Sequence, residues 1–146
     1  MTEILIKRLS KNVHLPRYET DGASGMDLSA NIENEIEIEP GKTAIISTGL
    51  AVSIPKKFEI QIRPRSGLAA KNQISVLNTP GTIDADYRGE IKVILINLGQ
   101  SNFKIQKGLR IAQMVLCPVI KATLKEVDTL EKTERGTAGF GSTGTT

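Results

Sequence analysis

Arg65, Ser66 and Gly67 form a combination typical of a phosphate-binding site. Pro64 predicts the end of a strand, and the residues after it predict a short helix over 66–71 with Ser66 as its N-cap. Free backbone N–H groups and the positive end of the helix dipole favour an anion at such a helix start, and the guanidinium of Arg65 offers donors that match phosphate oxygens. A capped helix with an ion-paired arginine explains the same residues, so this segment alone leaves both interpretations open.

Residues 77–90 predict a hairpin around a Pro-Gly turn, with Asn78 before the turn and Asp84 after it. The exposed backbone N–H and C=O groups of such a hairpin can bind the edge of a flat base, as an added strand would. Asp84 is a candidate general base for a water molecule that a substrate brings within reach. Asp86 is either its helper or a turn cap, and turn chemistry alone also explains both aspartates.

Two further segments concentrate glycine and polar side chains at predicted strand ends. Residues 23–30 contain Asp27, and residues 107–114 contain Arg110 and Gln113. The C-terminal stretch differs from both, because it is rich in Gly, Ser and Thr and is typical of a disordered tail. A tail of that kind does not explain why an arginine and a phenylalanine stand within it. It is not a P-loop either, since no lysine follows its glycines.

Apolar and polar residues alternate along most of the chain, and this period of two predicts short strands. The segments, separated by Gly, Pro, Asn and Asp, are 32–39, 44–46, 49–54, 58–63, 90–96 and 110–116. They predict an all-β sandwich or barrel with 66–71 as its short helix. Residues 121–134 are ambiguous: Leu124, Val127 and Leu130 stand three apart, as in a helix, yet Thr and Val there also suit a strand. We expect a strand followed by a linker there.

The composition narrows the possible functions. The chain has 146 residues, a net charge of +3 and an aromatic content of 3%, which indicates one domain with an aliphatic core. Its basic residues are scattered and form no stripe with aromatic residues, so we expect no nucleic-acid partner. No apolar run approaches the ~20 residues of a membrane span, and the N-terminus does not resemble a signal peptide. We therefore expect a cytoplasmic protein without a membrane partner, and the residues leave a nuclear location or a viral origin open.

Cysteine and histidine are too scarce for several kinds of site. Cys117 is the single cysteine and His14 the single histidine. An intrachain disulfide is therefore impossible, and a structural zinc site is not expected. We interpret Cys117 as a small buried thiol within an apolar run, and His14 as a surface residue rather than part of a Ser-His-Asp triad.

Taken in order, the five polar segments resemble the five motifs of the trimeric dUTPase family. The resemblance spans residues 23–144, and three stretches are individually specific: Arg-Pro-Arg-Ser-Gly-Leu-Ala, Gly-Thr-Ile-Asp-Ala-Asp-Tyr-Arg-Gly and Arg-Gly-Thr-Ala-Gly-Phe-Gly-Ser-Thr-Gly. It implies a jelly-roll-like β-barrel over residues 1–134 and a flexible arm over 135–146 that closes an active site. It also implies a homotrimer with interfacial sites that hydrolyses dUTP to dUMP and pyrophosphate with Mg²⁺. That reaction would limit uracil incorporation into DNA and supply dUMP for thymidylate synthesis.

The same resemblance implies a role for each site residue. Asp84 is the catalytic residue, which orients the water that attacks the α-phosphorus. Tyr87 packs under the deoxyribose and blocks a 2′-hydroxyl. Uracil is bound by Asn78 and by the backbone of Gly81, Thr82 and Ile83. The phosphates are held by Arg65, Ser66, Gly67 and Gln113.

The arm completes the implied site. Arg135 binds the γ-phosphate and Phe140 stacks on uracil, while Gly141, Ser142 and Thr143 add substrate contacts. No protein side chain is expected to bind Mg²⁺ directly, because the ion is held by substrate phosphates and water. Asp27 supports either that water shell or a neighbouring arginine, and Arg110 is either structural or ligand-binding.

Three other interpretations fit parts of the sequence. A dCTP deaminase, or its bifunctional relative, shares the barrel, but its chemistry needs a glutamate beside the pyrimidine where this segment offers Asp84 and Asp86. A jelly-roll protein that binds a nucleotide without cleaving it would not need Asp84, Gln113 and Arg135 intact. A structural trimer such as a capsid module leaves the polar motifs without a purpose.

Overall fold

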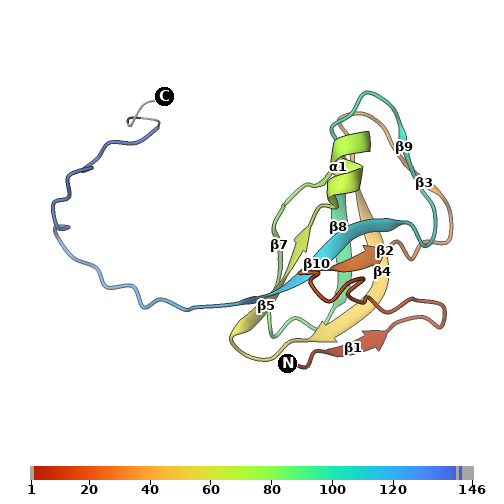
Figure 1. Cartoon of the computed structure of the whole chain (residues 1–146), viewed down its shortest axis with the longest axis horizontal. Coiled ribbons are helices and arrows are strands. Elements are labelled where there is room, and N and C mark those ends of the chain that lie inside the picture. The colour runs from red at the N-terminus through yellow and green to blue at the C-terminus, as the bar shows by residue number, and fades with distance from the viewer. Residues whose placement is uncertain (1, 141, 143–146) are drawn as a thin grey trace.

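The computed structural model describes residues 2–140 and 142, and in this part of the chain the fold is built almost entirely from antiparallel strands (Figure 1). The strands are β1 (Leu5–Arg8), β2 (Met26–Ser29), β3 (Ile36–Ile38), β4 (Thr43–Ser53), β5 (Phe58–Arg63), β6 (Ile74–Val76), β7 (Gly81–Ile83), β8 (Glu90–Asn97), β9 (Phe103–Ile105) and β10 (Arg110–Pro118), and the helix is α1 (Ser66–Asn72). Two four-stranded sheets have the orders β1-β4-β8-β6 and β2-β10-β5-β7, and β3 pairs with β9. The three sheets do not join into one closed hydrogen-bonded cylinder. The all-β, jelly-roll-like fold is confirmed.

The core between the sheets is aliphatic, as the composition predicts. Leu28, Ile60 and Leu95 are fully buried, and they come from three different strands. In β5 the burial of the side chains alternates, because Ile60 and Ile62 are buried while their neighbours in the strand are only half-buried. Strands with one buried apolar face stabilise a sandwich, because the two sheets pack these faces against each other.

Strand β4 combines two predicted strands into one. The segments predicted over 44–46 and 49–54 fall in one strand that ends at Ser53, with a shift in its register against β8 between Ser47 and Ala51. Gly49 lies at this shift with a φ of +69°, a conformation that glycine adopts without strain. The strand predicted over 32–39 is shorter than expected, since only Ile36–Ile38 pairs, with β9.

The segment 77–90 does not form the predicted hairpin around its Pro-Gly turn. Strand β6 pairs with β8, whereas β7 pairs with β5, so the residues between β6 and β7 cross from one sheet to the other. Gly81 begins β7 opposite Ile62, and a Cβ at Gly81 would lie 3.3 Å from the Cβ of Ile62. The crossing is therefore fixed by close contact of its far end with the second sheet.

Regular structure ends at Pro118, and the chain then runs away from the sheets (Figure 1). The strand predicted at the start of 121–134 is wrong, because residues 121–134 carry neither strand nor helix. Ile120, Leu124 and Leu130 are 95%, 93% and 87% exposed, so no sheet edge of the same chain covers them. A strand needs a partner edge, which the local pattern cannot supply. Among the described residues, no helix is long and apolar enough to cross a membrane.

Candidate active site

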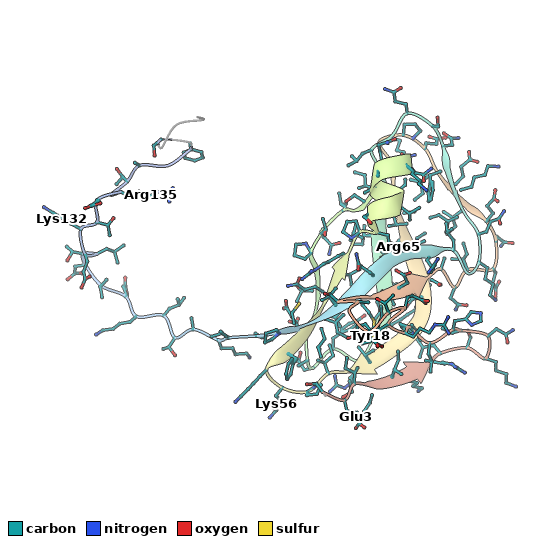
Figure 2. All side chains as sticks on the ribbon, viewed as in Figure 1. Glu3, Tyr18, Lys56, Arg65, Lys132 and Arg135 are labelled. Atoms are coloured by element: carbon teal, nitrogen blue, oxygen red, sulfur yellow. The ribbon has the colours of Figure 1, made fainter. Side chains whose placement is uncertain are left out.

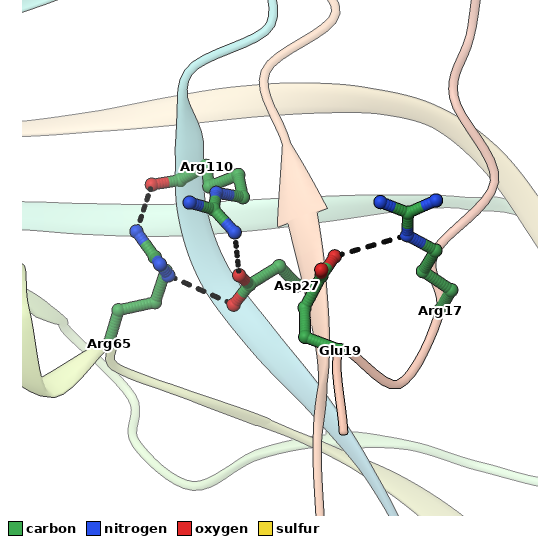
Figure 3. Close-up of polar contacts among 5 residues, drawn as sticks. All are labelled: Arg17, Glu19, Asp27, Arg65 and Arg110. Atoms are coloured by element: carbon green, nitrogen blue, oxygen red, sulfur yellow. Dashed lines mark hydrogen bonds and ion pairs between the residues drawn. The ribbon is translucent and has the colours of Figure 1, made fainter. Parts of the chain in front are cut away.

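The carboxylate of Asp27 holds two arginines in place, and we call these three residues the Asp27 cluster (Figure 3). Nε of Arg65 donates to Oδ1 of Asp27 at 2.9 Å, and Nη1 of Arg110 donates to Oδ2 at 3.0 Å. Nη1 of Arg65 also lies 3.4 Å from the backbone oxygen of Arg110. The side chains of Asp27 and Arg65 are only 20% and 27% exposed, which limits the solvent screening of their ion pair. These contacts orient both guanidinium groups and leave N–H donors of Arg65 available for an anion.

Asp27 meets the arginines because three strands bring them together. Asp27 lies in β2 opposite Gln113 of β10, and Gln113 in turn lies opposite Arg63 at the end of β5. Arg65 follows two residues later, where the chain leaves β5. Arg110 opens β10. The contact with the arginines that we predicted as one alternative for Asp27 is therefore present.

Gln113 is fixed beside the start of α1. Its Nε2 donates to the backbone oxygen of Pro64 at 2.9 Å. Its Oε1 lies directly over Gly25, where an added Cβ would overlap with it. The side-chain amide is thus held in one orientation between two backbone segments, and it contacts the residue that directly precedes Arg65.

The start of α1 differs in one respect from the prediction. Ser66 is the first helical residue, and the N-cap is Arg65, which makes no side-chain capping bond. An arginine side chain has no acceptor and cannot cap a helix, and the guanidinium of Arg65 is engaged by Asp27 instead. Ser66 and Gly67 are exposed, and the first N–H groups of a helix have no partner within it. This turn adds donors next to the Asp27 cluster.

A groove between β7 and β8 contains the other predicted residues. Two adjoining hollows share Thr82, Ile83, Lys92 and Ile94 along their walls. Asn78 and Gly81 line one hollow, and Asp84 and Tyr87 line the other. The groove therefore combines apolar side chains, backbone groups and a carboxylate, as a site for a base and a sugar requires.

Tyr87 is held by its own loop. Its Oη donates to the backbone oxygen of Glu90 at 2.9 Å, and its N–H donates to the backbone oxygen of Asp84 at 3.1 Å. The ring lies over Gly89, where an added Cβ would overlap with the ring. Glu90 has no predicted role, yet its carboxylate accepts a hydrogen bond from the backbone of Gly49.

The register of β5 separates the two groups of residues within one chain. Ile83 at the end of β7 lies opposite Ile60, so Asp84 lies near the beginning of β5. Arg65 lies beyond the opposite end of β5, five residues past Ile60, which is on the order of 17 Å along an extended strand. The Asp27 cluster and the carboxylate of Asp84 therefore do not face one another within the chain.

Arg135, at the start of the arm, lies apart from both groups (Figure 2). Nε of Arg135 donates to the backbone oxygen of Ala138, a contact inside the arm, and the side chain of Phe140 is fully exposed. The N–H of Ser142 donates to the backbone oxygen of Gly139 at 3.1 Å. Gly141 and Thr143 lie outside the described residues.

The fold and this site define a jelly-roll-like β protein in which the Asp27 cluster, Gln113 and the start of α1 gather hydrogen-bond donors. The family model for dUTPase matches residues 11–144. The deoxyuridine 5′-triphosphate nucleotidohydrolase of Rickettsia bellii is 57% identical over 145 residues, which cover 99% of this chain and 97% of the relative. The enzyme of the same name from Clostridium tetani is 54% identical over 146 residues, covering 99% of each chain. The chain belongs to the dUTPase family.

Solved structures of dUTPases are similar to this chain in fold. The dUTPase of Staphylococcus bacteriophage 80alpha, in a structure with dUPNHPP, superposes with a TM-score of 0.88 at 29% identity, covering 99% of each chain. A second structure of the same dUTPase superposes with a TM-score of 0.80 at 27% identity and covers 89% of this chain. Each of the two superpositions covers 99% of the other chain.

Proposed function

We propose that this chain hydrolyses dUTP to dUMP and pyrophosphate, with Mg²⁺, by attack of water on the α-phosphorus. The observation that carries the proposal is the Asp27 cluster, which holds Arg65 beside Gln113 and the start of α1. The relatives named as deoxyuridine triphosphate nucleotidohydrolases, at 54–57% identity, support the choice of substrate. A phosphorylated ligand fits such a site because guanidinium, amide and backbone N–H groups all donate.

The phosphates would be bound by Arg65, Gln113, Ser66 and Gly67. Uracil would lie against Asn78 and the backbone of Gly81, Thr82 and Ile83, with Tyr87 under the sugar. Gly81 supports a tight pocket, because it already lies against both Asn78 and Ile62. A rigid wall excludes a larger base more strongly than an adaptable apolar pocket does.

Asp84 would act as the general base. It accepts a proton from water as the water oxygen bonds to the α-phosphorus, and the bond from the α-phosphorus to the bridging oxygen breaks. Pyrophosphate then leaves with that oxygen. Asp84 is exposed at the mouth of the groove, where a bound nucleotide can bring water to it.

The assembly would be a homotrimer in which different copies complete each site. The separation of Asp84 from Arg65 along β5 supports this, because one chain does not bring the two around a single nucleotide. The arm over residues 135–146 would close over a site of other copies, bringing Arg135, Phe140, Gly141, Ser142 and Thr143 to the substrate. Exposed apolar side chains before the arm (Ile120, Leu124 and Leu130) and Phe140 within it are consistent with covering by another copy.

The donor set fits an ion that arrives with the substrate. Among the described residues, no group of three His, Cys, Asp or Glu side chains could hold a metal. Both oxygens of Asp27 already accept from arginines, although each has a further lone pair for a metal-bound water. Asp27 would thus support Mg²⁺ only through water. Mg²⁺ bound to the phosphates would neutralise part of the charge on the departing pyrophosphate.

The test is pyrophosphate release from dUTP, dTTP, UTP and dCTP in parallel, with and without Mg²⁺. Rapid release from dUTP alone is expected. Ammonia release from dCTP would identify a deaminase instead. Tight dUTP binding without release would identify a nucleotide-binding protein.

A further inference from the structure

Strand β4 bulges opposite the first residues of β8. Ser47 pairs with Lys92 and Ala51 pairs with Glu90, so residues 48–50 of β4 face Ile91 alone. A bulge of this kind removes backbone groups from the ladder of hydrogen bonds. Gly49 lies in the middle of it and is buried, so its N–H needs an acceptor.

Two side chains supply the missing bonds of the bulge. Oε1 of Glu90 accepts from the N–H of Gly49 at 2.9 Å. Oγ1 of Thr48 donates to the backbone oxygen of Ile91 at 2.6 Å, and both of these groups are buried. The backbone oxygen of Gly49 accepts from the N–H of Leu9 at 2.8 Å. The bulge is therefore fixed on both sides, and its position is well defined.

Glu90 also holds Tyr87, but through its backbone. The backbone oxygen of Glu90 accepts from Oη of Tyr87 at 2.9 Å. Gly89, between the two residues, leaves room for the ring to lie flat on the chain. The side chain of Glu90 is thus tied to β4 while its backbone positions the tyrosine ring at the mouth of the groove.

We propose that Glu90 is a positioning residue that sets the selectivity of the site for deoxyribose over ribose. The inference rests on the proposed function, in which Tyr87 packs under the sugar. A pocket excludes an added hydroxyl group strongly only if its wall is rigid, because a flexible pocket accommodates the hydroxyl at small cost. The bond from Gly49 to Glu90 keeps the backbone of residue 90 in place, and with it the hydroxyl of Tyr87.

The experiment compares kcat/KM for dUTP with kcat/KM for UTP in Glu90→Ala and Glu90→Gln. This ratio does not depend on how much of the enzyme is folded, because inactive enzyme lowers both values equally. Glu90→Ala is expected to lower the ratio roughly ten-fold, the size of one hydrogen bond to a charged acceptor. Glu90→Gln keeps an acceptor oxygen for Gly49, so its ratio is expected to stay within about two-fold of wild type.

Thr48→Val is the matched control. It removes the neighbouring hydrogen bond of the same bulge, to Ile91, without touching Glu90 or Tyr87. A destabilised bulge alone would lower the melting temperature of both variants and leave the selectivity ratio unchanged. A lowered ratio in Glu90→Ala together with an unchanged ratio in Thr48→Val supports the proposal. An unchanged ratio in folded Glu90→Ala overturns it, as does an equal loss in both variants.

A second readout does not require turnover. The chain has two tyrosines and no tryptophan, so Tyr18→Phe leaves Tyr87 as the only tyrosine fluorophore. In that background Glu90→Ala is expected to increase acrylamide quenching of Tyr87, and Thr48→Val is not. If the wild type does not hydrolyse dUTP, the proposed function fails while the quenching still tests the positioning. If Glu90→Ala does not fold, Glu90→Asp replaces it, because the shorter side chain does not reach the N–H of Gly49. The same loss of the selectivity ratio and the same increase in quenching are then expected, and an unchanged ratio overturns the proposal.

Discussion

Replacing Asp27 with asparagine perturbs the site in two opposite directions. The carboxylate bonds to Nε of Arg65 at 2.9 Å and to Nη1 of Arg110 at 3.0 Å, so its loss frees both guanidinium groups. The same change removes a negative charge from a site that we propose binds a triphosphate. The first effect weakens nucleotide binding, and the second strengthens it.

The geometry indicates that the loss of orientation is the larger effect. The Asp27 carboxylate is paired with two guanidinium groups, which offset its field, so its repulsion of a phosphate charge about 6 Å away stays close to the value in water, roughly 0.7 kcal/mol, and salt reduces it further. A hydrogen bond to a charged group contributes about 1.5–3 kcal/mol, which the partial exposure of the Asp27–Arg65 pair reduces to about 1–2 kcal/mol. Arg110 is 50% exposed and adds little. The net loss of binding free energy in Asp27→Asn is about 1 kcal/mol, which corresponds to roughly five-fold weaker nucleotide binding.

The assay is calorimetric titration of a nonhydrolysable dUTP analogue into Asp27→Asn at two salt concentrations. Glu19→Gln is the charge-matched control, because among the described residues Glu19 pairs with Arg17 alone, whose side chain is 79% exposed, in the same region of the surface (Figure 3). The control is expected to bind as tightly as wild type or slightly tighter. If Asp27→Asn binds the analogue as tightly as Glu19→Gln does, the Asp27 cluster does not orient Arg65 for the substrate and the reasoning fails.

Three further predictions follow from the proposed function. Asp84→Asn should lower kcat by roughly 10²-fold or more while the Kd for a dUTP analogue changes little, and rapid-quench turnover at the wild-type rate would remove Asp84 from the mechanism. Deleting residues 135–146 should abolish most activity without changing the assembly mass measured by light scattering, and an undiminished rate would show that the arm is a passive tail. Mixing inactive Asp84→Asn and Arg65→Ala subunits after reversible unfolding should restore part of the activity, because some sites then combine intact residues from two copies. Mixtures that stay inactive would indicate a site within one chain.

The strands were predictable wherever one face of the sheet is buried. Residues 58–63 alternate in sequence and form β5 with those bounds, because the alternation is itself the consequence of facing the core and the solvent in turn. Gly49 shows the limit of this reasoning. A glycine between two apolar runs indicates either a turn or a bulge, and only the pairing of Ser47 and Ala51 with β8 distinguishes them.

The segment 121–134 was not predictable from its pattern. Leu124, Val127 and Leu130 stand three apart and suit more than one element, yet they remain exposed and outside any sheet. A local sequence carries a propensity, but a strand forms only where a neighbouring edge offers hydrogen bonds. Within the part of the chain that the structure describes, the segment meets no such edge, so its structure depends on contacts that its own residues do not encode.

The sequence motifs propose residues for the site, but they do not predict how those residues are arranged. The motifs identify Arg65 and Asp84 as neighbours in function, and only 19 positions separate them in sequence. The antiparallel register of β5 and β7 nevertheless sets them at opposite ends of one strand. Glu90 shows the same limitation, since no motif indicates that its carboxylate reaches Gly49, 41 residues away.

This separation is itself an argument about how the enzyme works. In the proposed function the phosphate donors lie at one end of β5, whereas the groove proposed for the base and Asp84 lies at the other end, and side-chain movement alone does not bring Arg65 and Asp84 together. Changing the register of β5 and β7 by one residue would turn Ile60 and Ile62 out of the core, so the strands cannot slide to close the distance. The remaining way to bring the two groups together is to take them from different copies of the chain. If the proposed roles of Arg65 and Asp84 hold, assembly is then a requirement of the chemistry, and the monomer should bind nucleotide weakly at either end without turning it over.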